Sequence, residues 1–188
     1  STDYVFSGNA SEPYKTDTPL APVNYYGQTK ADGEQMAIEA NPNSIIIRTS
    51  WVFSSHGNNF VKTMMRLMKE RDALNIVGDQ KGRPTYAKDL AIASIQMLEQ
   101  INAGKSFQGI YHYANTGETT WYDFAARIQS IGKLTCDLTA IPSEQFPTPA
   151  KRPNYSVLDT TRMEKELGIQ IPSWESALQQ CMEIISRG

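Results

Sequence analysis

The chain has 188 residues, 40% of them apolar and 20% charged, with a formal net charge of −2. This composition excludes a wholly disordered chain, and the small charge gives no electrostatic basis for general nucleic-acid binding. No apolar run approaches the length of a membrane-spanning helix, and no signal peptide opens the chain. Two cysteines are too few for a disulfide scaffold or a structural zinc site, so we expect a cytoplasmic protein.

Short apolar runs alternate with helical periodicities along the chain, which predicts an α/β fold with a mainly parallel sheet. The predicted strands are residues 1–6, 45–53, 75–77 and 109–114. The predicted helices are residues 25–39, 59–68, 90–98, 120–131, 161–167 and 173–185. A loop rich in glycine and proline joins the first strand to the first helix. Because the chain enters a strand-like run directly at Ser1, we expect it to be part of a longer protein.

Tyr26 and Lys30 place a phenol and an ammonium group four residues apart on the first predicted helix. That spacing puts both side chains on one helix face, within reach of each other or of one ligand. A neighbouring positive charge stabilises the phenolate form of a tyrosine, which makes the phenol a better proton donor at neutral pH. The pair therefore suits the reduction of a carbonyl group, although such a pair also arises by chance.

Several further blocks occur in order around this pair. They are STDYVF at 1–6, YGQTKADGE at 26–34, RTSWVF at 48–53, NFV at 59–61, DQKGRPT at 79–85, DLA at 89–91 and RP at 152–153. Together they resemble the extended short-chain dehydrogenase/reductases over essentially the whole chain, and within that group the reductases of nucleotide-linked keto sugars. The resemblance implies the remainder of a doubly wound, Rossmann-like parallel sheet plus a small α/β substrate-binding domain. It also implies reduction of the C4 keto group of dTDP-4-dehydro-L-rhamnose to dTDP-L-rhamnose, in the biosynthesis of cell-surface polysaccharide.

The same resemblance implies roles for three residues at the reacting carbonyl. Tyr26 would give a proton to the keto oxygen, and Thr2 would donate a hydrogen bond to that oxygen. Lys30 would assist Tyr26 and hold the nicotinamide ribose, so Tyr26 and Lys30 would also contact the cofactor. Three donors around one oxygen stabilise the charge that develops there. Without the resemblance, Thr2 would be interpreted as an ordinary hydroxyl at the end of a strand.

The resemblance also implies contacts between further residues and the nucleotide sugar. Asp3 and Trp51 are predicted sugar contacts, because a carboxylate accepts bonds from hydroxyls and an indole suits the apolar side of a deoxysugar. The residues predicted to reach the nucleotide diphosphate are Asn59, Arg83 and Arg152. The isolated histidines, His56 and His112, are interpreted as structural or surface residues, and we assign no metal site.

Alternative functions within the resemblance remain. Dehydratases of the superfamily carry a second carboxylate after the aspartate, but Tyr4 follows Asp3 here, which argues against dehydration. Epimerases share the threonine, tyrosine and lysine and are harder to exclude. A non-catalytic alternative is a regulatory protein similar to the β subunit of methionine adenosyltransferase, although Trp51 favours a reductase.

The glycine-rich phosphate loop of a dinucleotide-binding fold does not occur in the sequence. The resemblance therefore implies that such a half precedes Ser1, and NADPH or NADH is expected as cofactor of the complete protein. Residues 1–53 would end the dinucleotide-binding domain, and residues 54–188 would mainly bind the nucleotide sugar, with 86–115 returning to the sheet. The isolated chain should bind the cofactor poorly and lack reductase activity. An unpaired strand edge would also favour a homodimer.

Overall fold

The computed structural model describes residues 1–187 as six α-helices, eight short strands and two 3₁₀ turns. The helices are α1 (Tyr25–Ala40), α2 (Phe60–Glu70), α3 (Ala87–Asn102), α4 (Trp121–Gly132), α5 (Thr161–Leu167) and α6 (Trp174–Arg187), and the turns are η1 (Asp3–Val5) and η2 (Ser143–Gln145). The strands are β1 (Ile45–Arg48), β2 (Val52–Phe53), β3 (Ala73–Val77), β4 (Lys81–Gly82), β5 (Thr85–Tyr86), β6 (Gly109–His112), β7 (Thr119–Thr120) and β8 (Asp137–Ile141). All six predicted helices are present.

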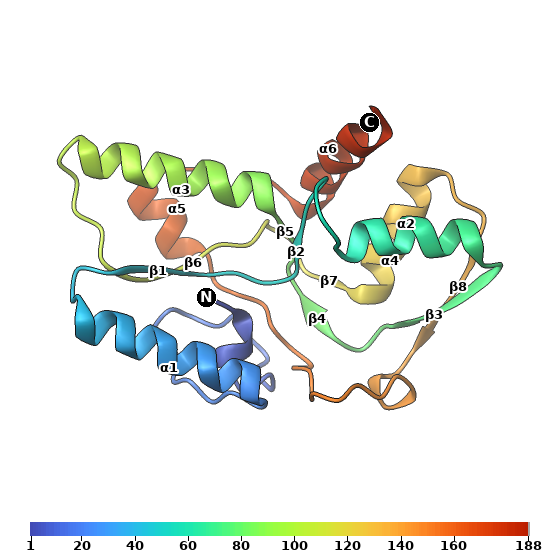
Figure 1. The fold of residues 1–188 in the computed structure, drawn as a ribbon, viewed down its shortest axis with the longest axis horizontal. Coiled ribbons are helices and arrows are strands. Elements are labelled where there is room, and N and C mark those ends of the chain that lie inside the picture. The colour runs from blue at the N-terminus through green and yellow to red at the C-terminus, as the bar shows by residue number, and fades with distance from the viewer. Residues whose placement is uncertain (188) are drawn as a thin grey trace.

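The strands pair two by two, and three of the four pairs are parallel. β1 pairs with β6, β2 with β5 and β3 with β8 in parallel, whereas β4 and β7 are antiparallel. Parallel pairing requires a crossover between the partners, and helices of this chain provide it. Figure 1 shows β1 and β6 lying between α1 on one side and α3 with α5 on the other. The predicted α/β fold with parallel strands is confirmed.

Three hydrophobic clusters hold these layers together. Ala93 and Met97 of α3 pack with Tyr111 on one side of the β1–β6 pair. Val5 and Ala31 belong to a second cluster under α1. The third and largest cluster lies in the other half of the molecule, where α2, α4 and α6 meet β3. The molecule thus has a half built around β1 and β6 and a half built around β3 and β8.

The prediction of a strand at residues 1–6 is wrong over most of that range. Thr2 makes a single parallel bridge with Thr49, and the chain then turns into η1. The cause is local, because the Thr2 hydroxyl accepts a hydrogen bond from the Tyr4 amide and so caps the turn. The second predicted strand is interrupted as well, because Trp51 has a left-handed backbone, with φ of 47°, between β1 and β2.

The apolar residues of α3 do not all face the core. Ala93 and Met97 are buried, whereas Ile95 and Leu98 are exposed. The helix carries apolar residues on more than one face, so periodicity alone does not decide which face packs on β6. No helix of the described residues is both long and apolar enough to cross a membrane.

Candidate active site

A cavity of about 450 Å³ opens where β1 ends and α1 begins. Its lining comes from η1, α1, the segment between β1 and β2, and the loop before Pro153: Ser1, Thr2, Asp3, Tyr4, Asn24, Tyr26, Thr49, Ser50, Trp51, Val52, Ala150 and Arg152. We call it the small cavity. The carboxyl ends of parallel strands are the usual place for ligands in α/β sheets. Five predicted site residues from separate segments therefore meet at one location.

Tyr26 reaches the small cavity because α1 begins unusually close to η1. The side chain of Asn24 caps the helix by accepting a hydrogen bond of 2.8 Å from the Gly27 amide. A Cβ atom on Gly27 would overlap the Tyr4 carbonyl oxygen, so a larger residue would push the helix away. The Tyr26 ring meets the Tyr4 ring edge to face, and its side chain stays half exposed. Tyr26 is thus oriented yet accessible to a ligand.

Lys30 lies one helical turn beyond Tyr26 but does not line the small cavity. Its ammonium group is near the Ser1 amino group. Burial, followed by the charge of Lys30, lowers the pKa of that amino group. The Ser1 amino group in turn donates a hydrogen bond of 2.7 Å to the Ile47 carbonyl. Lys30 therefore lies near the start of the chain and outside the lining of the small cavity.

Thr2 and Asp3 are polar residues in the buried wall of the small cavity. Thr2 is 6% exposed and Asp3 is 3% exposed. The Thr2 hydroxyl donates a hydrogen bond of 3.0 Å to Asp3 Oδ1, while Asp3 Oδ2 has no partner among the described residues. Burial raises the pKa of Asp3 to about 7, although hydrogen bonds to its charged form oppose that shift. The wall of the cavity therefore retains unused hydrogen-bonding capacity.

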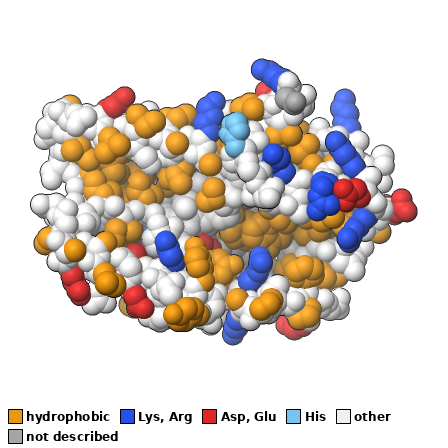
Figure 2. Space-filling view, in the orientation of Figure 1, with side chains coloured by type: hydrophobic (Ala, Val, Ile, Leu, Met, Phe, Trp, Pro, Cys, Tyr) orange, Lys and Arg blue, Asp and Glu red, His pale blue; other side chains and the backbone are white. Residues whose placement is uncertain are grey.

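A second cavity, of about 1,020 Å³, lies in the half of the molecule built around β3 and β8. We call it the large cavity. Its lining includes apolar residues of α2 and β3 and polar residues such as Gln80 and Ser143. The space-filling view shows hydrophobic side chains together with several Lys and Arg side chains on this half of the molecule (Figure 2). Arg152 lines both cavities and so connects them.

Comparison with known proteins agrees with this arrangement. Residues 1–187 match the family described as RmlD substrate binding domain. The chain belongs to this family. It is 44% identical over 186 residues to the dTDP-4-dehydrorhamnose reductase of Aggregatibacter actinomycetemcomitans and 39% identical over 188 residues to that of Escherichia coli K12. These alignments include 95% and 97% of this chain but 63% of each relative, so the RmlD-type chain spans less than two thirds of their length.

Solved structures give the same result for the fold. A dTDP-4-dehydrorhamnose reductase of Clostridium acetobutylicum superposes with a TM-score of 0.93 at 38% identity, covering 99% of this chain and 64% of the other. The Bacillus anthracis enzyme, solved in complex with NADP, gives a TM-score of 0.88 at 39% identity, covering 98% and 63%. A dTDP-glucose 4,6-dehydratase at 18% identity shares the fold. The predicted family and the predicted Rossmann-like fold are therefore confirmed.

Two residues predicted to reach the diphosphate, Asn59 and Arg83, make hydrogen bonds within the chain. Asn59 caps α2, since its side chain accepts from the Lys62 amide and donates to the Ser54 carbonyl. Arg83 donates a hydrogen bond of 2.9 Å to the Leu158 carbonyl. Neither residue lines the small or the large cavity. Both contacts stay predictions, and neither is used in the proposed binding set; Arg83 Nε has no partner among the described residues.

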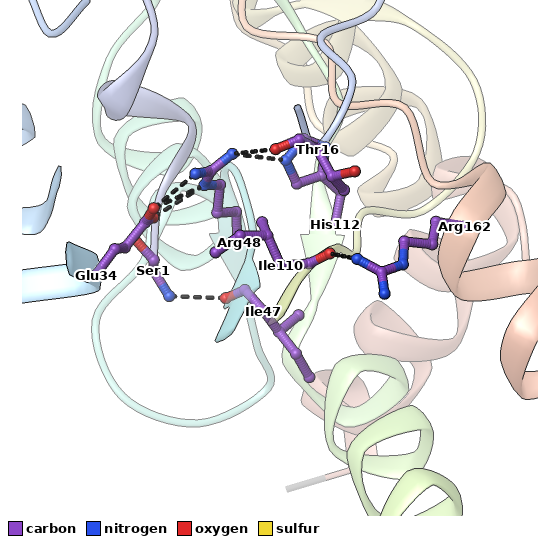
Figure 3. Close-up of polar contacts among 8 residues, drawn as sticks. All are labelled: Ser1, Thr16, Glu34, Ile47, Arg48, Ile110, His112 and Arg162. Carbon is purple, nitrogen blue, oxygen red and sulfur yellow. Dashed lines mark hydrogen bonds and ion pairs between the residues drawn. The ribbon is translucent and has the colours of Figure 1, made fainter. Parts of the chain in front are cut away.

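A buried ion pair between α1 and β1 was not predicted. Figure 3 shows the Arg48 guanidinium of β1 facing the Glu34 carboxylate of α1, with hydrogen bonds of 2.6–3.1 Å. Arg48 also contacts the Thr16 carbonyl and His112 Nε2, each at 3.3 Å. The pair joins the tyrosine-bearing helix to β1. His112 is therefore structural, as predicted, and His56 lies exposed at the surface.

Tyr4 and Trp121 are site residues that the sequence alone did not reveal. Tyr4 lines the small cavity beside Tyr26, and Trp121 lines the large one. Trp121 stacks on Trp51, with ring centroids 3.7 Å apart and planes 10° apart. The order of residues gave no signal for this contact, because the two tryptophans are far apart in the chain. Within residues 1–187, no group of three or more His, Cys, Asp or Glu side chains is arranged to hold a metal.

Proposed function

We propose that the longer protein containing this chain reduces the C4 keto group of dTDP-4-dehydro-L-rhamnose to give dTDP-L-rhamnose with NAD(P)H. The observation that carries the proposal is the meeting of Tyr26, Thr2 and Trp51, from three separate segments, in the small cavity. The names of the relatives at 38–44% identity support the substrate class. Such an enzyme acts in nucleotide-sugar biosynthesis. We propose that the protein is cytoplasmic.

In the proposed reaction, Tyr26 donates its phenolic proton to the keto oxygen. This proton donation is supported by the half-exposed position of Tyr26 at the cavity. A positioned acid of this kind contributes by neutralising negative charge on the oxygen as it forms. Lys30 follows on the same helix face and adds positive charge near the phenol.

Thr2 donates a second hydrogen bond to the keto oxygen. Its hydroxyl proton is directed at Asp3 Oδ1 when no ligand is bound, so it must turn toward the ligand. A neutral Asp3 carboxyl can donate a hydrogen bond to the Thr2 oxygen, which frees the hydroxyl proton for this purpose. The raised pKa of Asp3, about 7, supports the neutral form. The unpartnered Asp3 Oδ2 is then the proposed sugar contact.

The residues present fit the nicotinamide end of NAD(P)H. The accessible phenol of Tyr26 and the partly exposed side chain of Lys30 lie one turn apart on α1, where they can hold ribose hydroxyls. When bound, the cofactor supplies the reducing equivalent for C4. No glycine-rich phosphate loop occurs in this sequence, so the rest of the cofactor would be held by a preceding half. The domain division at residue 53 and the homodimer remain proposals.

The nucleotide sugar would occupy both cavities. The deoxysugar lies against the Trp51 indole in the small cavity, and the nucleoside enters the large cavity. Arg152 lines both, so its guanidinium is placed to bind the diphosphate between them. The apolar residues of the large cavity suit a base, and its polar residues suit ribose hydroxyls.

The decisive experiment follows NADPH oxidation by the longer protein with dTDP-4-dehydro-L-rhamnose as substrate. We expect turnover, with dTDP-L-rhamnose as the product. The control replaces the keto sugar with dTDP-glucose, which has no keto group to reduce. Absence of turnover together with tight binding to another protein would contradict the reductase and favour the regulatory alternative. Interconversion of two sugars without net NADPH oxidation would favour an epimerase.

A further inference from the structure

Trp51 has an unusual backbone for a large residue. Among residues 1–187, Trp51 and Lys133 are the two non-glycine residues with positive φ, at 47° and 51°. Lys133 ends α4, where a left-handed residue is common. Trp51 instead lies between two strands, where this conformation is costly and persists only if the surroundings hold it. The left-handed turn separates β1 from β2 and sends the indole into the small cavity.

Two neighbours hold the Trp51 indole. Trp121 stacks on the ring at a centroid separation of 3.7 Å. Gly82 approaches so closely that a Cβ atom there would lie 2.5 Å from Trp51 Cε2. The Trp51 ring therefore has a single position, because Trp121 packs flat against it and the backbone of Gly82 lies close to it. A side chain at position 82 or a non-planar side chain at position 121 would displace the indole.

One antiparallel strand pair positions both neighbours. Gly82 of β4 pairs with Thr119 of β7. Thr120 follows and caps α4, whose first residue is Trp121, by accepting a hydrogen bond of 3.1 Å from the Asp123 amide. The β4–β7 ladder therefore sets the distance between the glycine and the second indole. Trp121 is further held by Phe60 of α2, with ring centroids 4.7 Å apart.

The stacked indoles also stand between the two cavities, because Trp51 lines the small cavity and Trp121 lines the large one. We propose that Trp121, together with Gly82, is a positioning residue that holds Trp51 in place to receive the sugar. Trp121 thereby governs affinity for the sugar portion of a nucleotide sugar. This inference rests on the proposed function, since it takes the ligand of the small cavity to be a sugar.

The stack itself can be detected by circular dichroism of the 188-residue chain. Two stacked indoles couple their electronic transitions and give a paired positive and negative band in the far ultraviolet. The chain has three tryptophans, so each can be replaced in turn. We expect Trp51→Phe and Trp121→Phe each to abolish the paired bands and Trp174→Phe to retain them. Retention of the bands in Trp121→Phe would overturn the stack.

The positioning role is tested by calorimetric titration of the same chain with dTDP and with dTDP-L-rhamnose. The measured quantity is the ratio of the two affinities, in which any effect of Trp121 on the nucleotide cancels. We expect the sugar to raise the affinity of the unmodified chain, and Trp121→Leu to remove most of that gain, a loss of up to about tenfold in the ratio. Trp121→Tyr, which keeps a flat ring, should restore the ratio.

Gly82→Ala provides an independent variant, because it displaces Trp51 without changing Trp121. We expect it to lower the ratio while the dTDP affinity stays within about twofold, a difference of less than 1 kcal/mol. An unchanged ratio in both Gly82→Ala and Trp121→Leu would overturn the inference while leaving the proposed function intact. If the unmodified chain binds both ligands equally, the assignment of the small cavity to the sugar fails instead, and the inference fails with it.

Discussion

Asp3 and Glu34 are both buried carboxyl residues, 3% and 5% exposed. Their surroundings nevertheless shift their pKa values in opposite directions. Around Asp3, burial prevails and raises the pKa to about 7. Burial also acts on Glu34, but hydrogen bonds from the Arg48 guanidinium outweigh it and lower the pKa. Burial alone therefore does not determine the charge of a carboxyl group, because a buried cationic partner such as Arg48 can reverse the shift in pKa.

This difference distinguishes a candidate ligand-binding carboxyl group, Asp3, from a structural one, Glu34. Both oxygens of Glu34 accept hydrogen bonds from Arg48, so this pair has little capacity left for a ligand. Asp3 keeps one oxygen without a partner and lies beside Thr2 in the wall of the small cavity. The hydrogen-bonding capacity of Glu34 is thus used within the protein, whereas Asp3 keeps capacity for a further partner. Four predictions test this comparison.

The largest effect is expected from Tyr26→Phe in the longer protein. Loss of the proton donor should lower kcat by about 10²–10⁴-fold, the usual contribution of a positioned acid. Because Tyr26 is 53% exposed, the free energy of unfolding should hardly change. Steady-state kinetics and urea denaturation measure the two quantities. Turnover close to that of the unmodified enzyme would contradict the role of Tyr26.

Loss of the buried Glu34–Arg48 ion pair should lower the free energy of unfolding. Glu34→Gln leaves the Arg48 charge buried without its carboxylate, which should cost about 3–5 kcal/mol of unfolding free energy. The matched control is Glu70→Gln, because the Arg66–Glu70 pair has a similar separation of 2.6 Å but lies at the surface. There we expect a loss below about 1 kcal/mol. Equal losses in the two variants, measured by urea denaturation, would show that Glu34 is not a buried support.

The pH dependence of stability should reveal the buried groups individually. Since the folded pKa of Asp3 is raised from 3.8 to about 7, the folded chain binds the extra proton, and this contribution to stability falls as pH rises from 4.5 to 6.5. Burial, aided by Arg48, lowers the pKa of His112 from 6.5 to about 4, so its contribution rises over the same interval. Each amounts to about 2–3 kcal/mol, and the two oppose each other.

Single variants should therefore uncover slopes that cancel in the unmodified chain. Asp3→Asn should leave a stability that increases from pH 4.5 to 6.5, and His112→Gln one that decreases. Urea denaturation at several pH values gives both slopes. The interval avoids the titration of Glu34, whose lowered pKa removes stability at lower pH. A curve for His112→Gln that stays flat over this interval would mean that the pKa of Asp3 is not raised in the folded chain.

The smallest effect concerns Asn59, a residue whose motif suggested a ligand contact. As a helix cap, Asn59→Ala should cost about 1 kcal/mol of stability. The affinity for dTDP should not change, because the side chain lines neither cavity. Asn59→Asp keeps a capping oxygen and serves as the control. A marked loss of dTDP affinity at unchanged stability would return Asn59 to the binding set.

Much of the local structure followed from the residue order. The helix beginning at Tyr25 and the cap at Asn59 depend on contacts within a few residues, which local patterns encode. The Tyr26–Lys30 spacing likewise places two groups on one face without knowledge of the rest of the fold. The family resemblance added Thr2 and Trp51, which no spacing rule would have joined to them.

Only the tertiary structure decided the contacts between distant segments. Arg48 could have faced solvent, but α1 brings Glu34 against it. Likewise, only the folded structure shows that Arg83 donates a hydrogen bond to the Leu158 carbonyl. The left-handed turn at Trp51 and its stacking on Trp121 require the β4–β7 ladder and α2 to be in place. Local propensities act through neighbours in the chain, whereas cavities and buried ion pairs form between surfaces that meet only when the helices and strands pack.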